Sequence, residues 1–294
     1  MKLVTFSRSS GPLTLGVTDG VAVTAIAGRI PGAPNDMIAL IDRWPAWQKQ
    51  LETITTFDYP LRELRLHAPV PRPGKIFGIG MNYADHAAEA GGEPPKDQIW
   101  FSKAVTAVTG PYDPVERPIV SHMLDYEGEL VAVVGKRCRH ASAAQALEAI
   151  FGYSVGNDVS VRDWQLRTSQ YVLGKSFDTH APFGPWIVTA DSIDPGDLEI
   201  ATFVNGERRQ HSRTRQLIFD CAAQIAHLSK AMTLEPGDVI FTGTPAGVGG
   251  ARKPPAWLQR GDVVRVEIEG IGAIENPIVD EPAATRQGKL DTPS

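Results

Sequence analysis

The sequence predicts a β-dominated α+β fold with a small N-terminal unit. Short apolar runs rich in valine and isoleucine recur between residues 75 and 279 and are separated by glycine turns, a pattern typical of strands. Helical spacing is confined to a few segments. The proline-rich stretch 66–75 (LHAPVPRPGK) is typical of an extended connector. We therefore expect an N-terminal domain over 1–68, a core domain over 69–281 and a loose polar tail over 282–294.

The N-terminal segment is predicted to form a small α/β cap. Its β-rich runs at 2–7, 13–18 and 21–28 are separated by turn signals, which favours an antiparallel sheet. The segments 35–44 and 45–54 have the composition of two short helices, the second of them opened by a proline. We expect this unit to be a cap and not to contain the catalytic centre.

Two helices are expected to cover the strands of the core. Ser142 and Gln145 form a capping-box pattern at the start of 142–151, and the apolar residues of 217–232 keep helical spacing.

Composition excludes some classes of partner. The 294 residues include 29 basic and 34 acidic side chains, a net charge of −5, so the chain has no general attraction for nucleic acid or anionic membranes. The basic run 206–216 (GERRQHSRTRQ) lacks interleaved aromatic residues and is predicted to be a solvated hairpin and connector. Without a signal-peptide core or a bilayer-spanning run, the protein is expected in the cytoplasm, with Cys138 and Cys221 reduced.

An acid-rich strand is the first candidate for chemistry. Within 124–135 (LDYEGELVAVVG), Asp125, Glu127 and Glu129 alternate with apolar residues and therefore share one face of a strand. Clustered carboxylates at the end of a buried strand are costly unless a cation offsets their charge. Either a metal binds there, or this is the solvated face of an edge strand.

The segment 152–167 (GYSVGNDVSVRDWQLR) supplies further polar side chains. Asp158 stands where a predicted strand ends, and it can approach Glu127 and Glu129. Arg162 follows at helical spacing, and Gln165 lies three residues further on. The alternative is that Asp158 caps a helix and pairs with Arg162.

Three other segments offer groups for acid–base chemistry or binding. His86 and Glu89 stand at i and i+3 in a short predicted helix, so they form either a base held by an acid or an ordinary surface pair. Lys175 is bordered by small and aromatic residues and could stabilise an oxyanion. Thr244 lies in a glycine-rich turn whose amides could receive a carboxylate. That turn lacks the ending of a phosphate-binding loop.

Taken together, these motifs resemble the fumarylacetoacetate hydrolase family over about residues 70–280. The resemblance rests on GMNYADHAAE, DYEGELVAVVG, GYSVGNDVSVRDWQ, GKSFDTHAPFGPW, LEPGDVIFTGTPAGVG and GDVVRVEIEGIG, which occur in the order seen in the family. It implies a mixed β-sandwich roll, a homodimer and a divalent cation, Mg²⁺ or Mn²⁺ with Ca²⁺ possible. The N-terminal unit resembles the small extra domain of many bacterial members.

The resemblance also assigns roles by position. It implies Glu127, Glu129 and Asp158 as metal ligands, an all-oxygen set that suits hard cations, with Asp125 outside the matched set. The remaining roles are substrate binding by Arg162, Gln165 and Thr244, oxyanion stabilisation by Lys175, and activation of water by His86 with Glu89. His180 stands where the family pattern leads us to expect an apolar or small residue, so we expect an altered pocket there.

The implied activity is hydrolysis of a carbon–carbon bond in a 2,4-diketo acid, an acylpyruvate or fumarylpyruvate, through an enolate held by the metal and Lys175. Two alternatives on the same site are oxaloacetate decarboxylation and isomerisation of 2-hydroxyhepta-2,4-diene-1,7-dioate. A rival from another class is a metal-stabilised binding protein without turnover. The presence of His86, Glu89 and Lys175 favours an enzyme with a small keto-acid substrate.

Overall fold

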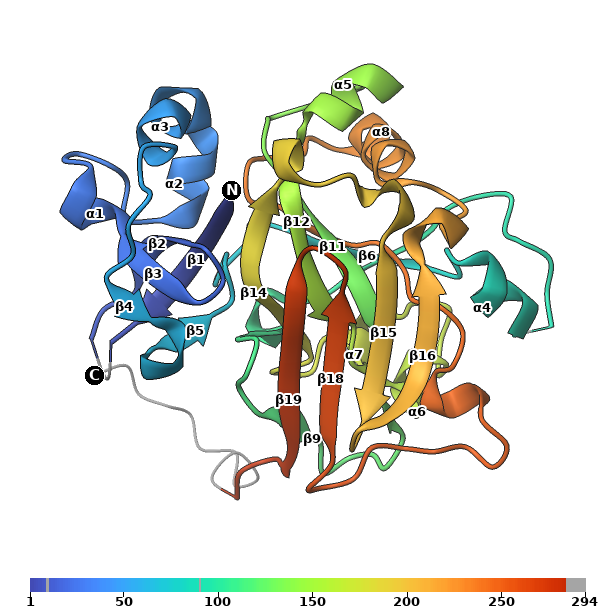
Figure 1. Cartoon of the computed structure of the whole chain (residues 1–294). Coiled ribbons are helices and arrows are strands. Elements are labelled where there is room, and N and C mark those ends of the chain that lie inside the picture. Colours follow the sequence, from blue (N-terminus) through green and yellow to red (C-terminus); the bar gives the residue numbers. More distant parts are fainter. Residues whose placement is uncertain (9–10, 90, 284–294) are drawn as a thin grey trace.

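The computed structural model describes residues 1–8, 11–89 and 91–283. The predicted β-dominated α+β fold is confirmed. Two large sheets with both antiparallel and parallel pairing pack together, and short helices cover them (Figure 1). Within the described ranges, no helix has the length and apolar character needed to cross a membrane.

The first sheet runs through the whole molecule in the order β4-β3-β2-β1-β14-β12-β11-β17-β6-β7, with β5 added to β1 and β8 to β14. Its strands are β1 (Lys2–Ser7), β2 (Thr14–Thr18), β3 (Ala22–Ala25), β4 (Tyr59–Pro60), β5 (Arg65–His67), β6 (Ile76–Gly80), β7 (Ile99–Ser102), β8 (Val108–Thr109), β11 (Gly128–Val134), β12 (Ile150–Asn157), β14 (Ala181–Thr189) and β17 (Val239–Phe241).

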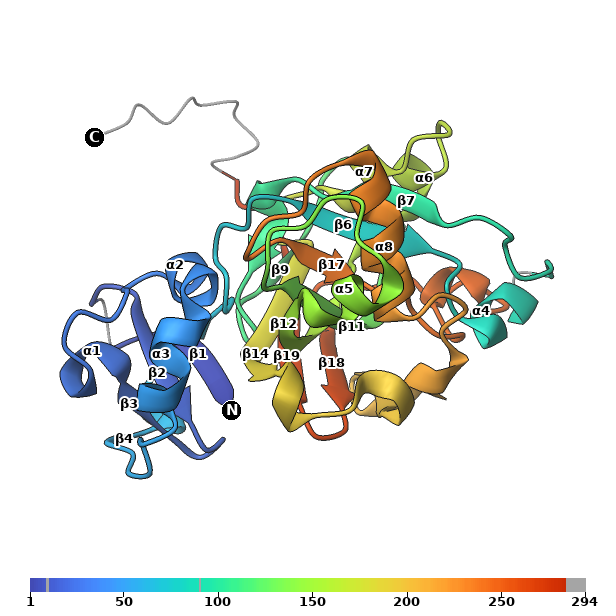
Figure 2. The ribbon, with the colours of Figure 1, turned by 90° about the horizontal axis from the view of Figure 1, so that it is seen from above.

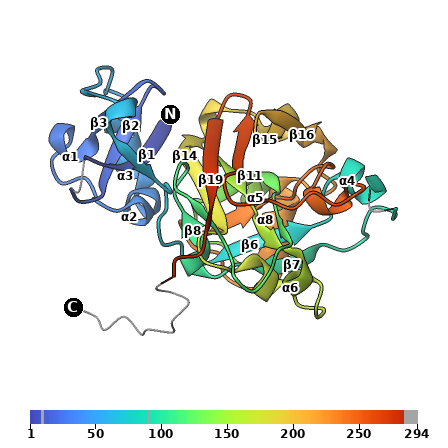
Figure 3. The ribbon, with the colours of Figure 1, turned by 90° about the horizontal axis from the view of Figure 1, so that it is seen from below.

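The second sheet has the order β16-β15-β18-β19-β9, and a short ladder joins β10 to β13. These strands are β9 (Val115–Arg117), β10 (Leu124–Asp125), β13 (Ser160–Val161), β15 (Glu199–Val204), β16 (Glu207–Arg213), β18 (Val263–Ile268) and β19 (Gly272–Asp280). Figure 2 and Figure 3 show the second sheet from its two ends, on one side of β11 and β12.

The helices are short and lie at the edges of the sheets. They are α1 (Ile26–Arg29), α2 (Met37–Asp42), α3 (Trp44–Leu51), α4 (Ala84–Glu89), α5 (Ala143–Glu148), α6 (Arg162–Gln165), α7 (Val172–Lys175) and α8 (Cys221–Ala231). The capping box of Ser142 and Gln145 opens α5 as predicted. The helix expected over 217–232 is shorter than predicted, because the side chain of Asp220 accepts the amide of Ala223 and so fixes the start of α8 at Cys221.

The N-terminal strands form the antiparallel unit that the sequence predicts, with α2 and α3 beside it. This unit is not a separate layer, because β1 pairs with β14 of the core and makes the first sheet continuous. The division between residues 68 and 69 therefore stays a prediction, and most of the tail over 282–294 lies outside the described residues.

The strand β11 is buried on both faces. It lies between β12 and β17, so it is a central strand and not an edge. Leu130 and Val134 belong to the core shared with the second sheet, while Val131 and Val133 pack into the core shared with the N-terminal unit. The interpretation of its acids as the solvated face of an edge strand is therefore wrong.

Candidate active site

Three buried carboxylates meet where β11 begins and β12 ends. The strand predicted over 124–135 is broken between β10 and β11, and the break places Glu127 just before β11. The β11–β12 ladder pairs Glu129 with Gly156, and the amide of Asp158 donates to the carbonyl of Glu127 at 2.8 Å. Ligand oxygens of Glu127, Glu129 and Asp158 consequently lie within 4.8 Å of one another.

Lys175, the last residue of α7, points into this cluster. Its ammonium group lies 2.7 Å from Oε2 of Glu127 and 2.6 Å from Oδ2 of Asp158, and the side chain is fully buried. Burial alone would lower the pKa of Lys175, but Asp158 and Glu127 raise it above its ordinary value. The lysine therefore remains a cation in the site.

A second buried lysine was missed by the sequence analysis. Lys103 follows β7, and its ammonium group lies 2.5 Å from Oδ1 of Asp158 and 3.3 Å from the carbonyl oxygen of Val159. A single lysine after a strand carries no sequence signal for burial, because most lysines remain in solvent. Only the tertiary structure, which brings its side chain to Asp158 beyond the end of β12, identifies it.

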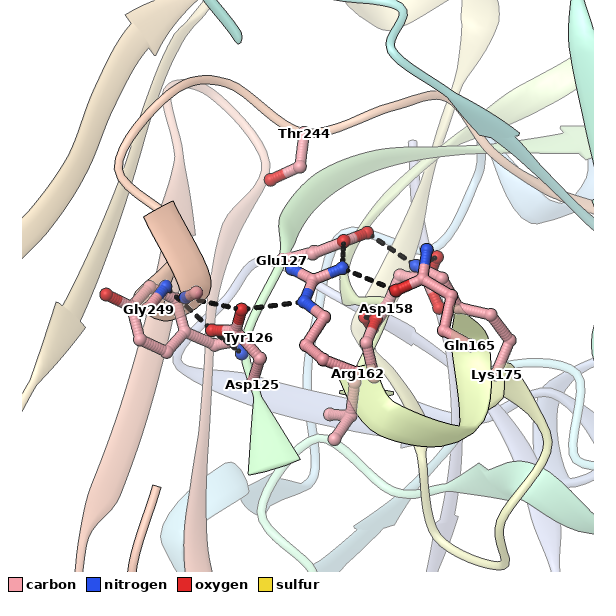
Figure 4. A network of polar contacts seen from close by, with 12 residues as sticks. Asp125, Tyr126, Glu127, Asp158, Arg162, Gln165, Lys175, Thr244 and Gly249 are labelled. Atoms are coloured by element: carbon pink, nitrogen blue, oxygen red, sulfur yellow. Dashed lines mark hydrogen bonds and ion pairs between the residues drawn. The ribbon is translucent and has the colours of Figure 1, made fainter. Parts of the chain in front are cut away.

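Arg162 bridges the cluster and Asp125 (Figure 4). Its guanidinium donates to Asp125 Oδ2 at 2.8 Å, to Glu127 Oε1 at 2.6 Å and to Gln165 Oε1 at 2.8 Å. The proposed pairing of Arg162 with a helix-capping Asp158 is wrong, since α6 begins at Arg162 itself and Val161 occupies the cap. The remaining nitrogen, Nη2, is buried and has no partner among the described residues.

Asp125 has a structural part in this arrangement. Its carboxylate also accepts the amides of Gly249 and Gly250, at 2.7 and 2.9 Å. These contacts fix Arg162 from the side away from Glu127, and Asp125 lies outside the group of three carboxylates that could hold an ion. The assignment of Glu127 and Glu129, without Asp125, as metal ligands stays a prediction that this grouping fits.

The charges on the cluster are unevenly compensated. Although burial opposes its ionisation, Lys175 and Arg162 hold the pKa of Glu127 well below its ordinary value. Glu129 has the opposite tendency, because burial and the nearby Asp158 and Glu127 raise its pKa well above the ordinary value. Among the ion pairs of the described residues none includes Glu129, whose Oε2 accepts only the amide of Gly243, at 2.8 Å.

A pocket of about 340 Å³ opens over the cluster. Six of the predicted site residues line it, namely His86, Glu127, Arg162, Gln165, Lys175 and Thr244. Glu129 and Asp158 lie beneath this lining, and Glu89 lies behind His86. The aromatic walls of the pocket are Phe101, Tyr171 and Trp257, which carry no sequence signal for a site because aromatic residues are equally common in cores.

His86 and Glu89 form a contact on α4, as their spacing predicts. Nδ1 of His86 lies 3.1 Å from Oε2 of Glu89, and Oε1 of Glu89 accepts the amide of Gly247 at 2.9 Å. The side chain of His86 is 14% exposed and lines the pocket, whereas Glu89 lies at the surface. The pair therefore stands at the rim of the pocket, and its catalytic role stays a prediction.

The glycine-rich turn after β17 does receive carboxylates, and they come from the protein itself. Its amides at Gly243 and Gly247 bind Glu129 and Glu89. The hydroxyl of Thr244 donates to the carbonyl of Gly128 at 2.9 Å and accepts from Gln210 at 2.8 Å. This turn thus fixes elements from three parts of the chain around the pocket.

His180 lies outside the pocket lining. Its Nε2 contacts the carbonyl of Glu116 at 2.8 Å in the interior, and burial lowers its pKa to about 3. The side chain is therefore a neutral imidazole that donates one hydrogen bond, and it does not alter the pocket in the way the sequence suggested.

The sequence model of the protein family fumarylacetoacetate hydrolase, C-terminal domain, matches residues 75–279 of this chain. This range includes every residue of the site described above. The chain belongs to the fumarylacetoacetate hydrolase family. The predicted membership is confirmed, and with it the chain is an enzyme of this family.

Related proteins extend the match to the N-terminal unit. Mitochondrial oxaloacetate tautomerase fahd2 of Xenopus laevis is 42% identical over 288 residues, covering 95% of this chain and 90% of that protein. The fumarylacetoacetate hydrolase of Exiguobacterium antarcticum is 38% identical with a TM-score of 0.82 and covers 96% of this chain and 100% of its own. Maleylpyruvate hydrolase from Sphingobium sp. SYK-6, solved with manganese(II) and pyruvate, is 33% identical with a TM-score of 0.81 and the same coverage. This family member therefore resembles enzymes of more than one reaction type.

Proposed function

We propose that this chain is a divalent-cation-dependent enzyme that forms the enolate of a small 2-oxo acid, with keto–enol tautomerisation of oxaloacetate as its first candidate reaction. The observation that carries the proposal is the buried carboxylate cluster with Lys175 and Arg162 beneath a pocket of about 340 Å³. The similarity over 95% of the chain to an oxaloacetate tautomerase supports this choice of reaction.

The donor set fits a hard divalent cation. Glu127, Glu129 and Asp158 offer only carboxylate oxygens, which suits Mg²⁺ or Mn²⁺ and also Ca²⁺. Glu129 is a buried carboxylate with no cationic partner among the described ion pairs, so an ion there would offset a charge that neither lysine pairs with directly. When bound, such an ion would polarise the 2-oxo group of the substrate.

The cationic side chains would hold the substrate in one orientation. Arg162 lines the pocket, and its buried Nη2 has no partner among the residues that the structure describes, so a substrate carboxylate would satisfy this donor. Gln165 would fix the guanidinium from the other side through its 2.8 Å contact. The ammonium group of Lys175 would stabilise negative charge on the 2-oxo oxygen as the enolate forms.

His86 is the proposed base. If Nδ1 donates to Glu89, Nε2 is left as the free acceptor on the side of the pocket. It would take a proton from the carbon next to the 2-oxo group, and the electron pair of that C–H bond would form the carbon–carbon double bond. The oxygen would then take up a proton from water, and His86 would return its proton to water, which gives the enol and the neutral imidazole again.

Hydrolysis of a 2,4-diketo acid is the second candidate. The same His86–Glu89 pair could remove a proton from water, and the hydroxide would add to the distal carbonyl before the carbon–carbon bond breaks. The similarity to a maleylpyruvate hydrolase favours this reaction. Oxaloacetate decarboxylation and dienedioate isomerisation would use the same enolate-stabilising side chains.

The test is to strip the protein with a chelator, restore Mg²⁺ or Mn²⁺, and offer oxaloacetate and acetylpyruvate in parallel. Cation-dependent loss of the enol absorbance of oxaloacetate, without pyruvate formation, would support the tautomerase. Acetate and pyruvate from acetylpyruvate, followed by NMR, would support the hydrolase. Pyruvate and CO₂ from oxaloacetate would identify a decarboxylase. No turnover of either compound, with metal binding intact, would contradict oxaloacetate tautomerisation and acetylpyruvate hydrolysis and favour the dienedioate isomerase or the binding protein.

We further propose a homodimer, a division into domains between residues 68 and 69, and a cytoplasmic location. Light scattering coupled to size exclusion would test the first, and limited proteolysis of 66–75 the second. The tautomerase from Xenopus laevis is mitochondrial, so fractionation of cells is the test of the third.

A further inference from the structure

The strand β16 contains side chains that the sequence analysis assigned to solvent. Along this strand and the residue after it, Gln210, Ser212 and Thr214 are buried while His211 is exposed, which is the alternation of a strand with one inward face. The inward face is polar. Each of its members therefore needs a hydrogen-bond partner in the interior.

Gln210 makes contacts on both sides of the glycine-rich turn. Its Oε1 accepts the amide of Gly128 at 3.0 Å, and its Nε2 donates to Oγ1 of Thr244 and to the carbonyl of Pro245, each at 2.8 Å. The side chain is 1% exposed. One glutamine thus joins the start of β11, where Gly128 stands between Glu127 and Glu129, to the turn that forms the opposite wall of the pocket.

These contacts determine how Thr244 is oriented. Its hydroxyl accepts from Gln210 and in turn donates to the carbonyl of Gly128, so the three residues close a ring of hydrogen bonds. Gly128 lies between Glu127 and Glu129. A Cβ at Gly128 would meet Oγ1 of Thr202 at 2.1 Å, so this backbone position is held closely from the side of the second sheet.

We propose that Gln210 is a positioning residue of the active site: it fixes the Thr244 hydroxyl and the backbone between Glu127 and Glu129, and so sets the distance between the substrate-binding wall and the carboxylate cluster. The inference rests on the proposed function, since it assumes that a 2-oxo acid binds between these two walls. Gln210 lies outside the pocket lining and acts through Thr244 and Gly128.

The experiment measures the binding of oxalate, a planar dianion that imitates the enolate of a 2-oxo acid, to Mn²⁺-loaded protein by calorimetry. Gln210→Met keeps the size of the side chain and removes all three hydrogen bonds. We expect oxalate affinity to fall about tenfold, the effect of losing roughly one to two hydrogen bonds, while Mn²⁺ affinity changes less than about threefold. Gln224→Met is the matched control, because Gln224 is an equally buried glutamine that donates to the carbonyls of Phe219 and Thr242 and does not line the pocket.

Thr244→Val supplies the second arm. If Gln210 acts through the Thr244 hydroxyl, Gln210→Met should lower the affinity for oxalate by less than about twofold in the Thr244→Val background. The reason is that the effects of coupled residues are not additive. Three results would each overturn this inference without touching the proposed function. They are an oxalate affinity of Gln210→Met equal to that of the wild type, an equal loss of oxalate affinity in Gln224→Met, and full additivity of Gln210→Met with Thr244→Val. Failure of the Mn²⁺-loaded wild type to bind oxalate would overturn the proposed function as well.

Discussion

The ammonium group of Lys103 lies 2.5 Å from Oδ1 of Asp158, with both side chains completely buried. Lys175 occupies the other oxygen of the same carboxylate. Asp158 is thus held from two sides by cations, and its position relative to Glu127 does not depend on solvent. The interior of the site is organised by ion pairs before any ligand enters.

Lys103→Met should lower the free energy of unfolding by about 3 kcal/mol, because it breaks a buried ion pair and leaves Lys175 as the remaining cation on Asp158. The measurement is urea unfolding of the metal-free protein. Lys136→Met is the control, since the Lys136–Glu148 pair is 3.6 Å long and both side chains are exposed, and it should change stability by less than about 0.5 kcal/mol. Similar losses in the two variants would contradict the structural importance assigned to Lys103.

Arg162→Lys should weaken oxalate binding by about tenfold or more although the charge is retained, because lysine cannot supply the free Nη2 donor while also contacting Asp125 and Glu127. Calorimetry on the Mn²⁺-loaded protein measures the loss. An affinity equal to that of the wild type would show that charge alone binds the carboxylate.

Ser212→Ala should loosen α4. The hydroxyl of Ser212 donates to Oδ2 of Asp85 at 2.6 Å, so the second sheet holds the helix that presents His86. Losing this hydrogen bond should cost about 1 kcal/mol locally and speed amide exchange over 84–89 about fivefold.

Hydrogen exchange read by mass spectrometry provides the measurement, with Ser154→Ala as the control for α4. Ser154 is also buried, but it donates to the carbonyls of Gly184 and Trp186 in the first sheet. If exchange over 84–89 is the same in the wild type and Ser212→Ala, the helix is held by its other contacts.

His180 should make stability depend on pH. Its pKa is about 3 in the folded protein, because burial disfavours the imidazolium, against an ordinary value of 6.5. The unfolded chain therefore binds more protons between these two values, and the contribution of His180 is fully present above pH 6.5 and is lost as the pH falls toward 3. The slope amounts to about 1.4 kcal/mol per pH unit within that window.

His180→Gln should reduce this slope between pH 4 and 6, since glutamine can still donate to the carbonyl of Glu116 but does not titrate. Unfolding at a series of pH values measures it. The exposed His211, changed to glutamine, is the control and should leave the slope unaltered. A slope that survives in His180→Gln would assign the pH dependence to other groups.

The sequence by itself determined the fold class, the family and the candidate carboxylates. Alternation identified Asp125, Glu127 and Glu129 as candidates, although the strand that was predicted to carry them is broken between β10 and β11. Local chemistry predicted the capping box of α5 and the His86–Glu89 contact. These last two follow from spacing along a single element, which the order of residues records directly.

The tertiary structure decided which groups meet across elements. The β11–β12 register brings Asp158 to Glu127, the end of β7 buries Lys103, and β16 turns Gln210 toward the site. It also separated Asp125, which anchors Arg162, from the two acids that can hold an ion. These relationships join residues tens of positions apart, and no local periodicity encodes them, because they depend on how the two sheets pack and which polar groups must find partners in the interior.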